Sequence, residues 1–395
     1  MDLNFILGNR ASLFEKDIDF LSEEIKAIVT SSRFLVIGGA GSIGQALVKE
    51  IFKRDPKVLH VVDISENNLV EMVRDLRSSI GYISGRFDTF SLDVGSNEFL
   101  RLLTDQEPYD YVMNLSALKH VRSEKDPYTL MRMVDVNIIN TLEILKHLRN
   151  SGVSNYFSVS TDKAANPVNL MGASKRIMEM FLMQESQIHN ISMARFANVA
   201  FSDGSLLHGF QQRLFKRQPF SAPSDIRRYF ITPKEAGELC LIATLFGNNR
   251  DILFPKLNSD FKPIALSDIA VRYLDTNGLK ALECATEQEA RDRALSMRDG
   301  EPWPCYFFKS DTTGEKEIEE FYTANETVNN NLFQGIGVIE SPVIEYGEKL
   351  ELFLDEILQL RSSKNWNKLD VVSAFEKLIP NFYHKELSKN LNQRM

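Results

Sequence analysis

Short apolar runs alternate with helical segments over residues 33–200 of the chain. The helical segments, such as IGQALVKEIFKR and NNLVEMVRDLRSSI, place apolar residues three and four positions apart. Strands that are apolar on both faces and separated by helices are typical of a parallel sheet covered on both sides. The pattern therefore predicts an α/β fold with a doubly wound parallel sheet, with strands at RFLVIGG (33–39), VLHVVD (58–63), FDTFSLD (87–93), YDYVMNL (109–115), NYFSVS (155–160) and ISMARF (191–196).

The alternation of strands and helices covers only part of the chain. Residues 1–32 predict an N-terminal helical extension, because LFEKDIDFLSEEIKAIV has apolar residues at helical spacing. Beyond about residue 200 loops and short elements follow, and we expect a smaller substrate-binding domain over residues 201–345. The tail, residues 346–395, is again helical in pattern and predicts a C-terminal helical extension.

Composition and charge exclude several classes of function. The apolar fraction of 43% and the charged fraction of 25% are those of a globular protein, and the net charge of −8 argues against a general nucleic-acid binder. No segment approaches the roughly 20 apolar residues that span a bilayer, and the first residues lack the apolar run of a signal peptide. The widely spaced Cys240, Cys284 and Cys305 fit neither a disulfide framework nor a metal site. We therefore expect a cytoplasmic protein with no metal, nucleic-acid or membrane partner.

A glycine-rich turn stands between the first strand and the first helix. IGGAGSIGQ contains Gly38, Gly41 and Gly44, which permit a tight turn and let backbone amides approach a pyrophosphate. The second strand ends in Asp63, whose carboxylate would accept hydrogen bonds from the adenosine ribose and repel a 2′-phosphate. Because strand, turn, helix and acidic strand end occur together, we expect residues 33–200 to form an NAD-binding Rossmann domain.

A second group of motifs points to a family. With the glycine spacing GxxGxxG, these motifs resemble the extended short-chain dehydrogenase/reductase family, and within it the nucleoside-diphosphate-sugar 4,6-dehydratases. The similarity is strongest to the UDP-N-acetylglucosamine 4,6-dehydratase branch of bacterial polysaccharide biosynthesis, which often has methionine in place of the usual tyrosine. It spans about residues 33–260, with a weaker echo at TTGEKEIEEF (312–321). The motifs are NLSALKHVRSEKDP (114–127), VDVNIINT (134–141), STDKAANPVNLMGASKR (160–176), ARFANV (194–199) and IRRYFIT (226–232).

The resemblance assigns the proton chemistry to Thr161, Asp162 and Lys163. Asp162 would protonate the C6 hydroxyl as it leaves the sugar, and Lys163 would remove the C5 proton. An amine is a base only when neutral, and a carboxyl is an acid only when protonated, so this role needs a closed, water-poor pocket. Out of context, Thr-Asp-Lys is an ordinary surface turn. The spacing to MGASK favours the catalytic interpretation.

The tyrosine that the family carries four residues before Lys175 is Met171 in this chain. Methionine can neither give nor take a proton, and taken alone Met171 is more typical of a core. Our hypothesis is that Lys163, through water and Thr161, also removes the proton of the C4 hydroxyl. By resemblance, Lys175 would hold the nicotinamide ribose, and Asn137 would stabilise a bent helix and a water beside that lysine.

Further positions follow from the same resemblance. Asp93 would contact the adenine, or else is an ordinary turn residue at a strand end. Arg228 is a candidate phosphate clamp, because a guanidinium bonds phosphate oxygens bidentately, or else a surface salt-bridge arginine. The remaining expected cofactor-binding residues are Ser42, Ile43, Val94, Ser116 and Ala117, and the remaining expected substrate-binding residues are Lys119, His120, Asn198 and Ser205.

The resemblance implies an NAD-dependent sugar-nucleotide 4,6-dehydratase. Its expected substrate is UDP-N-acetylglucosamine, its product the 4-keto-6-deoxy sugar with C5 configuration retained, and its expected assembly a homo-oligomer. TTGEK (312–316) stands where relatives have Arg-Pro-Gly-Glu-Lys, which leaves the nucleotide open between UDP and GDP. Two alternatives remain: a sugar-nucleotide C4 or C5 epimerase, which does not need the Asp162 acid, and a catalytically silent NAD-binding regulator.

Overall fold

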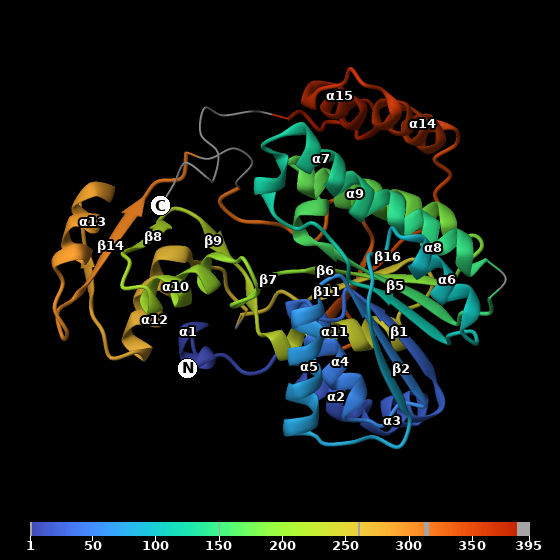
Figure 1. Ribbon diagram of the computed structural model, residues 1–395, viewed down its shortest axis with the longest axis horizontal. Coiled ribbons are helices and arrows are strands. Elements are labelled where there is room, and N and C mark those ends of the chain that lie inside the picture. Colours follow the sequence, from blue (N-terminus) through green and yellow to red (C-terminus); the bar gives the residue numbers. More distant parts are fainter. Residues whose placement is uncertain (1, 150, 260, 312–315, 385–395) are drawn as a thin grey trace.

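A nine-stranded sheet organises the larger part of the protein (Figure 1). The computed structural model describes residues 2–149, 151–259, 261–311 and 316–384. All six predicted strands are present, and the predicted doubly wound parallel sheet is confirmed. In spatial order the parallel strands are β3 (Arg86–Ser91), β2 (Val58–Asp63), β1 (Arg33–Ile37), β4 (Tyr111–Asn114), β5 (Asn155–Thr161), β6 (Ile191–Phe196) and β11 (Asp251–Pro255), followed by the antiparallel β16 (Ile336–Glu340) and β15 (Val328–Asn329).

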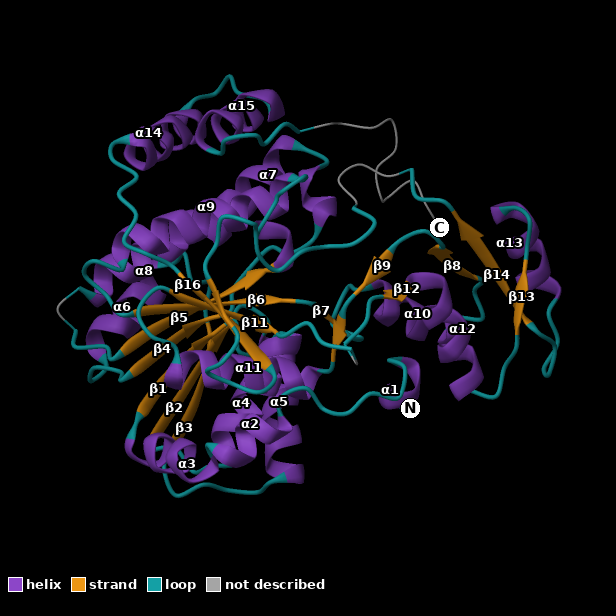
Figure 2. Ribbon diagram, turned by 180° about the vertical axis from the view of Figure 1, so that it is seen from behind, coloured by secondary structure: helices purple, strands orange, loops and turns teal. Residues whose placement is uncertain are grey.

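Helices cover both faces of this sheet, which explains why its central strands are almost fully buried. Every residue of β6 is buried, and β5 is exposed only in part at its last residue, Thr161. One face is covered by α4 (Ser42–Phe52), α5 (Glu66–Ser79) and α11 (Pro233–Phe246). The other face is covered by α6 (Asn97–Asp105), α7 (Pro127–Val134), α8 (Asn140–Leu148) and α9 (Leu170–Glu185) (Figure 2).

A smaller lobe lies beside the carboxyl ends of the parallel strands (Figures 1 and 2). It has its own apolar core, which includes Phe210, Phe220 and Trp303. Two short sheets separate from the main sheet pair β7 (Asn198–Val199) with β10 (Phe230–Ile231), and β9 (Arg227–Arg228) with β12 (Ile264–Ala265). The other elements of the small lobe are α10 (Leu206–Phe215), α12 (Leu266–Thr276), α13 (Glu287–Ser296), β8 (Phe220–Pro223), β13 (Ala281–Glu283) and β14 (Trp303–Phe308).

The chain returns to the main sheet after entering the small lobe. Helix α11 and strands β11, β15 and β16 fall within residues 201–345, yet they pack on or extend the nine-stranded sheet. The division of the chain at residues 200 and 345 stays a prediction.

Both ends of the described chain add helices. Helix α1 (Leu3–Ile6) packs on α12 of the small lobe, whereas α2 (Glu15–Phe20) and α3 (Ser22–Ser31) belong to the main body. Helices α14 (Lys349–Ser362) and α15 (Lys368–Leu378) pack against each other, and α15 contacts α7 and α9 (Figure 1). Residues 385–395 of the predicted C-terminal extension lie outside the described residues. Within the described chain, every helix is too short or too polar to cross a membrane.

The most buried ionic group is Arg195 on β6, which is fully buried. Its guanidinium donates to Glu179 of α9 at 2.7 and 2.9 Å and to Glu326 at 2.8 and 2.9 Å. It also donates to the Phe321 carbonyl, and Glu179 accepts from Ser160 of β5. Burial alone would raise the pKa of Glu179, but the charge and hydrogen bonds of Arg195 lower it to about 2. The cluster therefore joins two strands, one helix and the segment 321–326.

Replacing Arg195 with methionine should lower the free energy of unfolding by about 3–5 kcal/mol, because it leaves buried carboxylates unpaired. Urea denaturation at pH 7 measures this. The matched control is Arg149→Met, which removes a half-exposed ion pair with Glu185 and should cost under about 1 kcal/mol. Equal losses in the two variants would contradict the role of the cluster.

Because the pKa of Glu179 is lowered, its contribution to the free energy of unfolding is present above pH 4.5 and lost as pH falls toward 2.

Candidate active site

The glycine turn between β1 and α4 is too crowded for side chains. Gly38 has φ of +72°, and a Cβ there would lie 2.7 Å from the Ser116 amide nitrogen. A Cβ on Gly44 would lie 2.3 Å from the Gly38 carbonyl oxygen. Gly41 is the N-cap residue of α4. The backbone therefore forms a close turn at a helix N-terminus, which is the arrangement that binds pyrophosphate.

Asp63 lies at the end of β2, beside the glycine turn. One carboxylate oxygen accepts from the Ala40 amide at 2.9 Å, and the other accepts from the Ser65 amide at 2.9 Å. Each oxygen keeps a further lone pair for a ribose hydroxyl. The glycine turn and this carboxylate together fit a dinucleotide with an unmodified adenosine ribose. The half-buried side chains of Ile43 and Val94 pack against the main core.

The other expected cofactor positions have contacts of their own. Asp93 accepts from the Gly95 amide at 2.9 Å and pairs with Arg132 at 3.0 Å, so its carboxylate closes a turn; a contact with adenine stays a prediction. The Ser116 hydroxyl and amide both donate to Asn114, and the neighbouring Ala117 is half-buried.

Asn137 occupies a π-helical turn, Asp135–Ile139, between α7 and α8. Its amide side chain bonds both the amide and the carbonyl of Leu118, and it donates to the Ser174 hydroxyl at 2.9 Å. Extra residues in a helical turn are a common device at functional sites. Asn137 thus connects the loop after β4 to Ser174 of helix α9. Lys175 is the residue directly after Ser174.

Lys175 is buried on α9. Its Nζ donates to the Val159 carbonyl at 3.0 Å, and burial lowers its pKa to about 8, although the charge of Glu179 acts in the opposite direction. Its Nζ also donates to the Met178 Sδ at 3.5 Å, and these two hydrogen bonds leave one ammonium proton for another acceptor. A ribose hydroxyl is a suitable acceptor, and that contact stays a prediction.

Thr161, Asp162 and Lys163 follow β5 directly. Asp162 is 3% exposed, and its Oδ1 accepts from the Thr161 hydroxyl at 2.8 Å, the Lys163 amide at 2.9 Å and the Lys163 Nζ at 3.1 Å. The Lys163 side chain is 19% exposed, so its amine can meet a ligand. The two groups are within proton-exchange distance of each other, as the sequence prediction requires.

Met171 lies in the first turn of α9, with its side chain in the main core. Its amide donates to the Glu124 carboxylate at 2.7 Å. A Cβ on the next residue, Gly172, would lie 2.5 Å from the Lys163 carbonyl oxygen. This close approach holds the Asp162–Lys163 segment against the start of α9.

The expected substrate residues lie where the small lobe meets the main sheet. Asn198 begins β7, and Ser205 caps α10 by accepting from the His208 amide. Arg228 is buried, and its Nη1 donates to the carbonyls of Arg227, Lys316 and Glu317. Because Nη1 is occupied by these carbonyls, Arg228 could bind a phosphate only through Nε and Nη2. A phosphate clamp at Arg228 stays a prediction.

A loop from the small lobe reaches the glycine turn. Asp203 accepts from the Ser42 hydroxyl at 3.1 Å, while the Asp203 amide donates to the same hydroxyl at 2.8 Å. His120 is exposed on one side, and its ring atoms come within 2.7 Å of the position of a Cβ on Gly204. Lys119 is close enough for the charge of Asp203 to act on it, although burial around its amine lowers its pKa. Sequence reasoning gave no role to Asp203.

Sequence reasoning also missed Glu319. Its carboxylate is buried, with Oε1 at 3.9 Å from the Lys163 Nζ and 3.8 Å from the Arg228 Nη2. The weaker family similarity at residues 312–321 includes Glu319, but it gave no function for this residue. Residues 312–315 of that echo lie outside the described residues.

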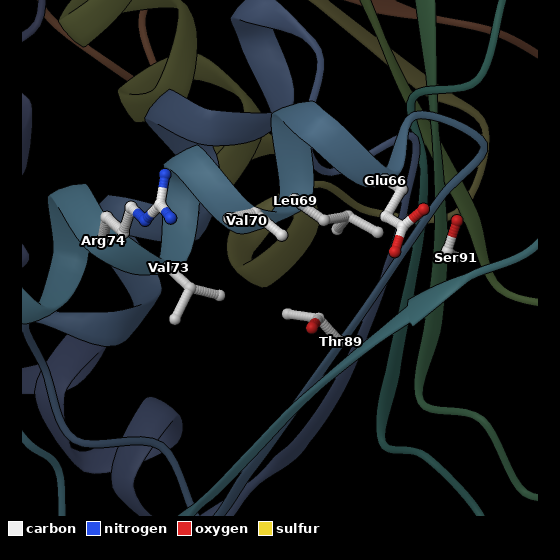
Figure 3. Close-up of a pocket in the computed structure, with 7 residues that line it drawn as sticks. All are labelled: Glu66, Leu69, Val70, Val73, Arg74, Thr89 and Ser91. Carbon is white, nitrogen blue, oxygen red and sulfur yellow. The ribbon is translucent and has the colours of Figure 1, made fainter.

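A pocket of about 500 Å³ lies between α5 and the edge strand β3 (Figure 3). None of the expected catalytic or binding residues lines it. One end holds Glu66 and Ser91, and Ser91 pairs in register with Asp63 (Figure 3). The pocket is therefore at the outer edge of the sheet and separate from the Asp162–Lys163 pair. Its lining residues are Glu66, Leu69, Val70, Val73, Arg74, Thr89 and Ser91.

Fold and site together define a Rossmann-fold protein that carries an aspartate–lysine pair at the carboxyl end of a central strand. Residues 34–335 match the family described as polysaccharide biosynthesis protein, and the chain belongs to this family. That match covers most of the main sheet and the small lobe.

Three relatives illustrate the similarity. The uncharacterized membrane protein MJ1061 of Methanocaldococcus jannaschii is 30% identical over 64% of this chain and 75% of its own length. The capsular polysaccharide biosynthesis protein CapD of Staphylococcus aureus is 25% identical over 96% of this chain, which spans only 55% of CapD. A UDP-glucose 4-epimerase of Rickettsia massiliae is 26% identical over 75% of this chain and 92% of its own length.

Two solved structures share the fold. Pen from Bacillus thuringiensis has a TM-score of 0.64 and 21% identity, covering 83% of this chain and 98% of that one. WbmF from Bordetella bronchiseptica, solved with NAD⁺, has a TM-score of 0.51 and 17% identity, covering 63% and 79%.

Replacing Lys175 with methionine should stabilise the fold by about 1–3 kcal/mol, because a buried ammonium with a pKa of about 8 is removed. Urea denaturation at pH 7 measures the gain. The control, Lys146→Met, removes a lysine whose side chain is 66% exposed and should change stability by less than about 0.5 kcal/mol. A large loss of stability in Lys175→Met would contradict this prediction, because it would show that the buried lysine stabilises the fold.

Proposed function

We propose that this protein is an NAD-dependent 4,6-dehydratase that converts UDP-N-acetylglucosamine to the 4-keto-6-deoxy sugar with retention at C5. The observation that carries the proposal is the buried Asp162 carboxylate within hydrogen-bonding distance of Lys163, next to a helix that has methionine in place of tyrosine. Membership of a polysaccharide biosynthesis family supports a nucleotide-sugar substrate. The choice of UDP-N-acetylglucosamine and of retention rests on the sequence resemblance.

Bound NAD⁺ would supply the redox chemistry, by accepting hydrogen from C4 as hydride and returning it to C6. In this proposal Gly38, Gly41 and Gly44 receive the pyrophosphate, Asp63 the adenosine ribose and Lys175 the nicotinamide ribose. WbmF, a structural neighbour solved with NAD⁺, supports this cofactor.

The first proton step belongs to Lys163. Neutral Lys163 takes the proton of the C4 hydroxyl as C4 is oxidised, with Thr161 at its side to orient a bridging water. The resulting ammonium passes that proton to Asp162 across the 3.1 Å contact, which leaves a neutral amine and a protonated carboxyl. Both groups are then in the form that elimination needs.

The second step uses the pair together. Lys163 removes the C5 proton, which the 4-keto group has made acidic, while Asp162 protonates the C6 oxygen, which leaves as water. Lys163 then returns a proton to C5 as C6 is reduced. The C4 hydroxyl proton has left in the water molecule, and Lys163 and Asp162 are back in their starting forms, so the cycle balances.

An epimerase is the second candidate, because the Rickettsia UDP-glucose 4-epimerase matches this chain over most of its length. Epimerisation at C4 requires oxidation and reduction at one carbon and no acid for a leaving hydroxyl. Asp162 would then have no chemical role. A buried carboxylate bonded to the adjacent lysine therefore favours the dehydratase. A silent NAD-binding regulator would need neither Asp162 nor Lys163.

The proposal predicts that UDP-N-acetylglucosamine loses one water when incubated with the protein and NAD⁺ in D₂O, and that the product carries deuterium at C5. Mass spectrometry followed by proton NMR measures both and gives the C5 configuration. Unchanged mass with inverted C4 would establish an epimerase, and deuterium at C5 without loss of water would establish a C5 epimerase. Bound NAD without any turnover of UDP- or GDP-sugars would favour the regulator.

The variant Asp162→Asn distinguishes a dehydratase from an epimerase, since it keeps the shape of the side chain and removes its acid function. A dehydratase should lose at least about 100-fold in the rate of water loss. An epimerase should keep its rate.

A further inference from the structure

Glu319 is a buried carboxylate that faces the Asp162–Lys163 pair. Its Oε1 lies 3.9 Å from the Lys163 Nζ and 3.8 Å from the Arg228 Nη2. Neither of its oxygens has a hydrogen-bond donor among the residues that the structure describes. An ionised carboxylate without hydrogen-bond donors is costly to bury. We therefore expect a nearby group to donate a hydrogen bond to Glu319 at some stage of the reaction.

The backbone around Glu319 is held in place from two sides. Arg228 donates to the carbonyls of Lys316 and Glu317, and the Arg227 amide donates to the Glu317 carbonyl at 3.0 Å. On the other side Arg195 donates to the Phe321 carbonyl at 2.9 Å. The Glu319 side chain is therefore presented to the reaction site by a fixed segment, although it lies far along the chain from Lys163.

The charges around Glu319 act on its pKa in opposite directions. Burial is the main factor that raises its pKa, and the Asp162 charge adds to this, whereas Lys163, Arg228 and Lys316 act to lower it. Lys163 lies between the two carboxylates, at 3.1 Å from Asp162 and 3.9 Å from Glu319. A small movement of a flexible lysine side chain is enough to exchange one partner for the other.

We propose that Glu319 is a positioning residue that takes the Lys163 ammonium from Asp162 and thereby sets the pH range in which Lys163 acts as a base. This inference rests on the proposed function for the role of Lys163. When Asp162 gives its proton to the leaving hydroxyl, Lys163 has just gained one from C5. The Glu319 carboxylate stabilises that ammonium over the sugar until the proton returns to C5. Only the Nζ–H hydrogen bond changes partner, and no bond to Glu319 is formed or broken.

The test measures the protonation of Lys163 directly and needs no substrate. The protein is trace-labelled with acetic anhydride at a series of pH values, and acetylation of the Lys163 peptide is measured by mass spectrometry. Glu319→Gln removes a negative charge at 3.9 Å, so the ammonium form is less stable and the labelling midpoint should move at least about one pH unit lower. Glu319→Asp, which keeps the charge, should stay near the wild-type midpoint.

Glu320→Gln is the matched control, since the adjacent carboxylate is exposed and pairs with Asn166 and Lys316. It should leave the midpoint unchanged. An unchanged midpoint in Glu319→Gln, or an equal shift in Glu320→Gln, would overturn the proposal. In turnover, the acidic limb of the pH profile of kcat should move in the same direction. A rise in KM without a pH shift would instead assign Glu319 to sugar binding.

The proposed function and the role of Glu319 can be disproved independently of each other. A wild-type protein that does not dehydrate UDP-N-acetylglucosamine would defeat the proposed function, yet the labelling midpoints would still decide whether Glu319 controls Lys163. Turnover by the wild type with identical midpoints in all variants would defeat the assignment of Glu319 alone.

Discussion

The buried guanidinium of Arg195 is the contact on which the geometry of the site depends. It holds Glu179 of α9, one helical turn after Lys175, and Glu179 in turn accepts from Ser160, which directly precedes Thr161. It also holds Glu326 and the Phe321 carbonyl, at the end of the segment that presents Glu319. One side chain therefore links the segments that carry Lys175 on the helix, the Asp162–Lys163 pair after β5 and the Glu319 carboxylate. Paired on every side, the cluster can be buried without leaving an isolated charge.

In the proposed mechanism, this arrangement takes over the role of the tyrosine that the resembling family carries. In the first turn of α9, the Met171 side chain packs in the main core, and its neighbour Gly172 lets the Lys163 backbone approach the helix closely. In the proposed mechanism, proton exchange is concentrated in Asp162 and Lys163, which are adjacent in sequence and share one hydrogen bond. The proposal uses the same groups twice, first for the hydroxyl at C4 and later for C5 and C6.

Much of the fold could be predicted from the sequence because it is determined locally. Apolar runs marked all six predicted strands, and the glycine spacing between the first strand and the first helix predicted a tight turn, in which Gly38 lies close to Ser116. Strand β16 was not predicted, since it joins the sheet only after the chain has passed through the small lobe. Glu319 and Asp203 could not be assigned for a similar reason. Each acquires its partner, Lys163 or Ser42, from a segment more than 150 residues away, and no local pattern records such a contact.

The most direct test of the account is a single-turnover measurement of reduced nicotinamide, by its absorbance, after mixing NAD⁺-loaded protein with UDP-N-acetylglucosamine. The account predicts that the wild type forms reduced nicotinamide transiently and that Asp162→Asn also forms it, because the acid acts only after C4 is oxidised. Lys163→Met should form none on the same timescale. Reduced nicotinamide formed by Lys163→Met at the wild-type rate would contradict the claim that this lysine takes the place of the missing tyrosine.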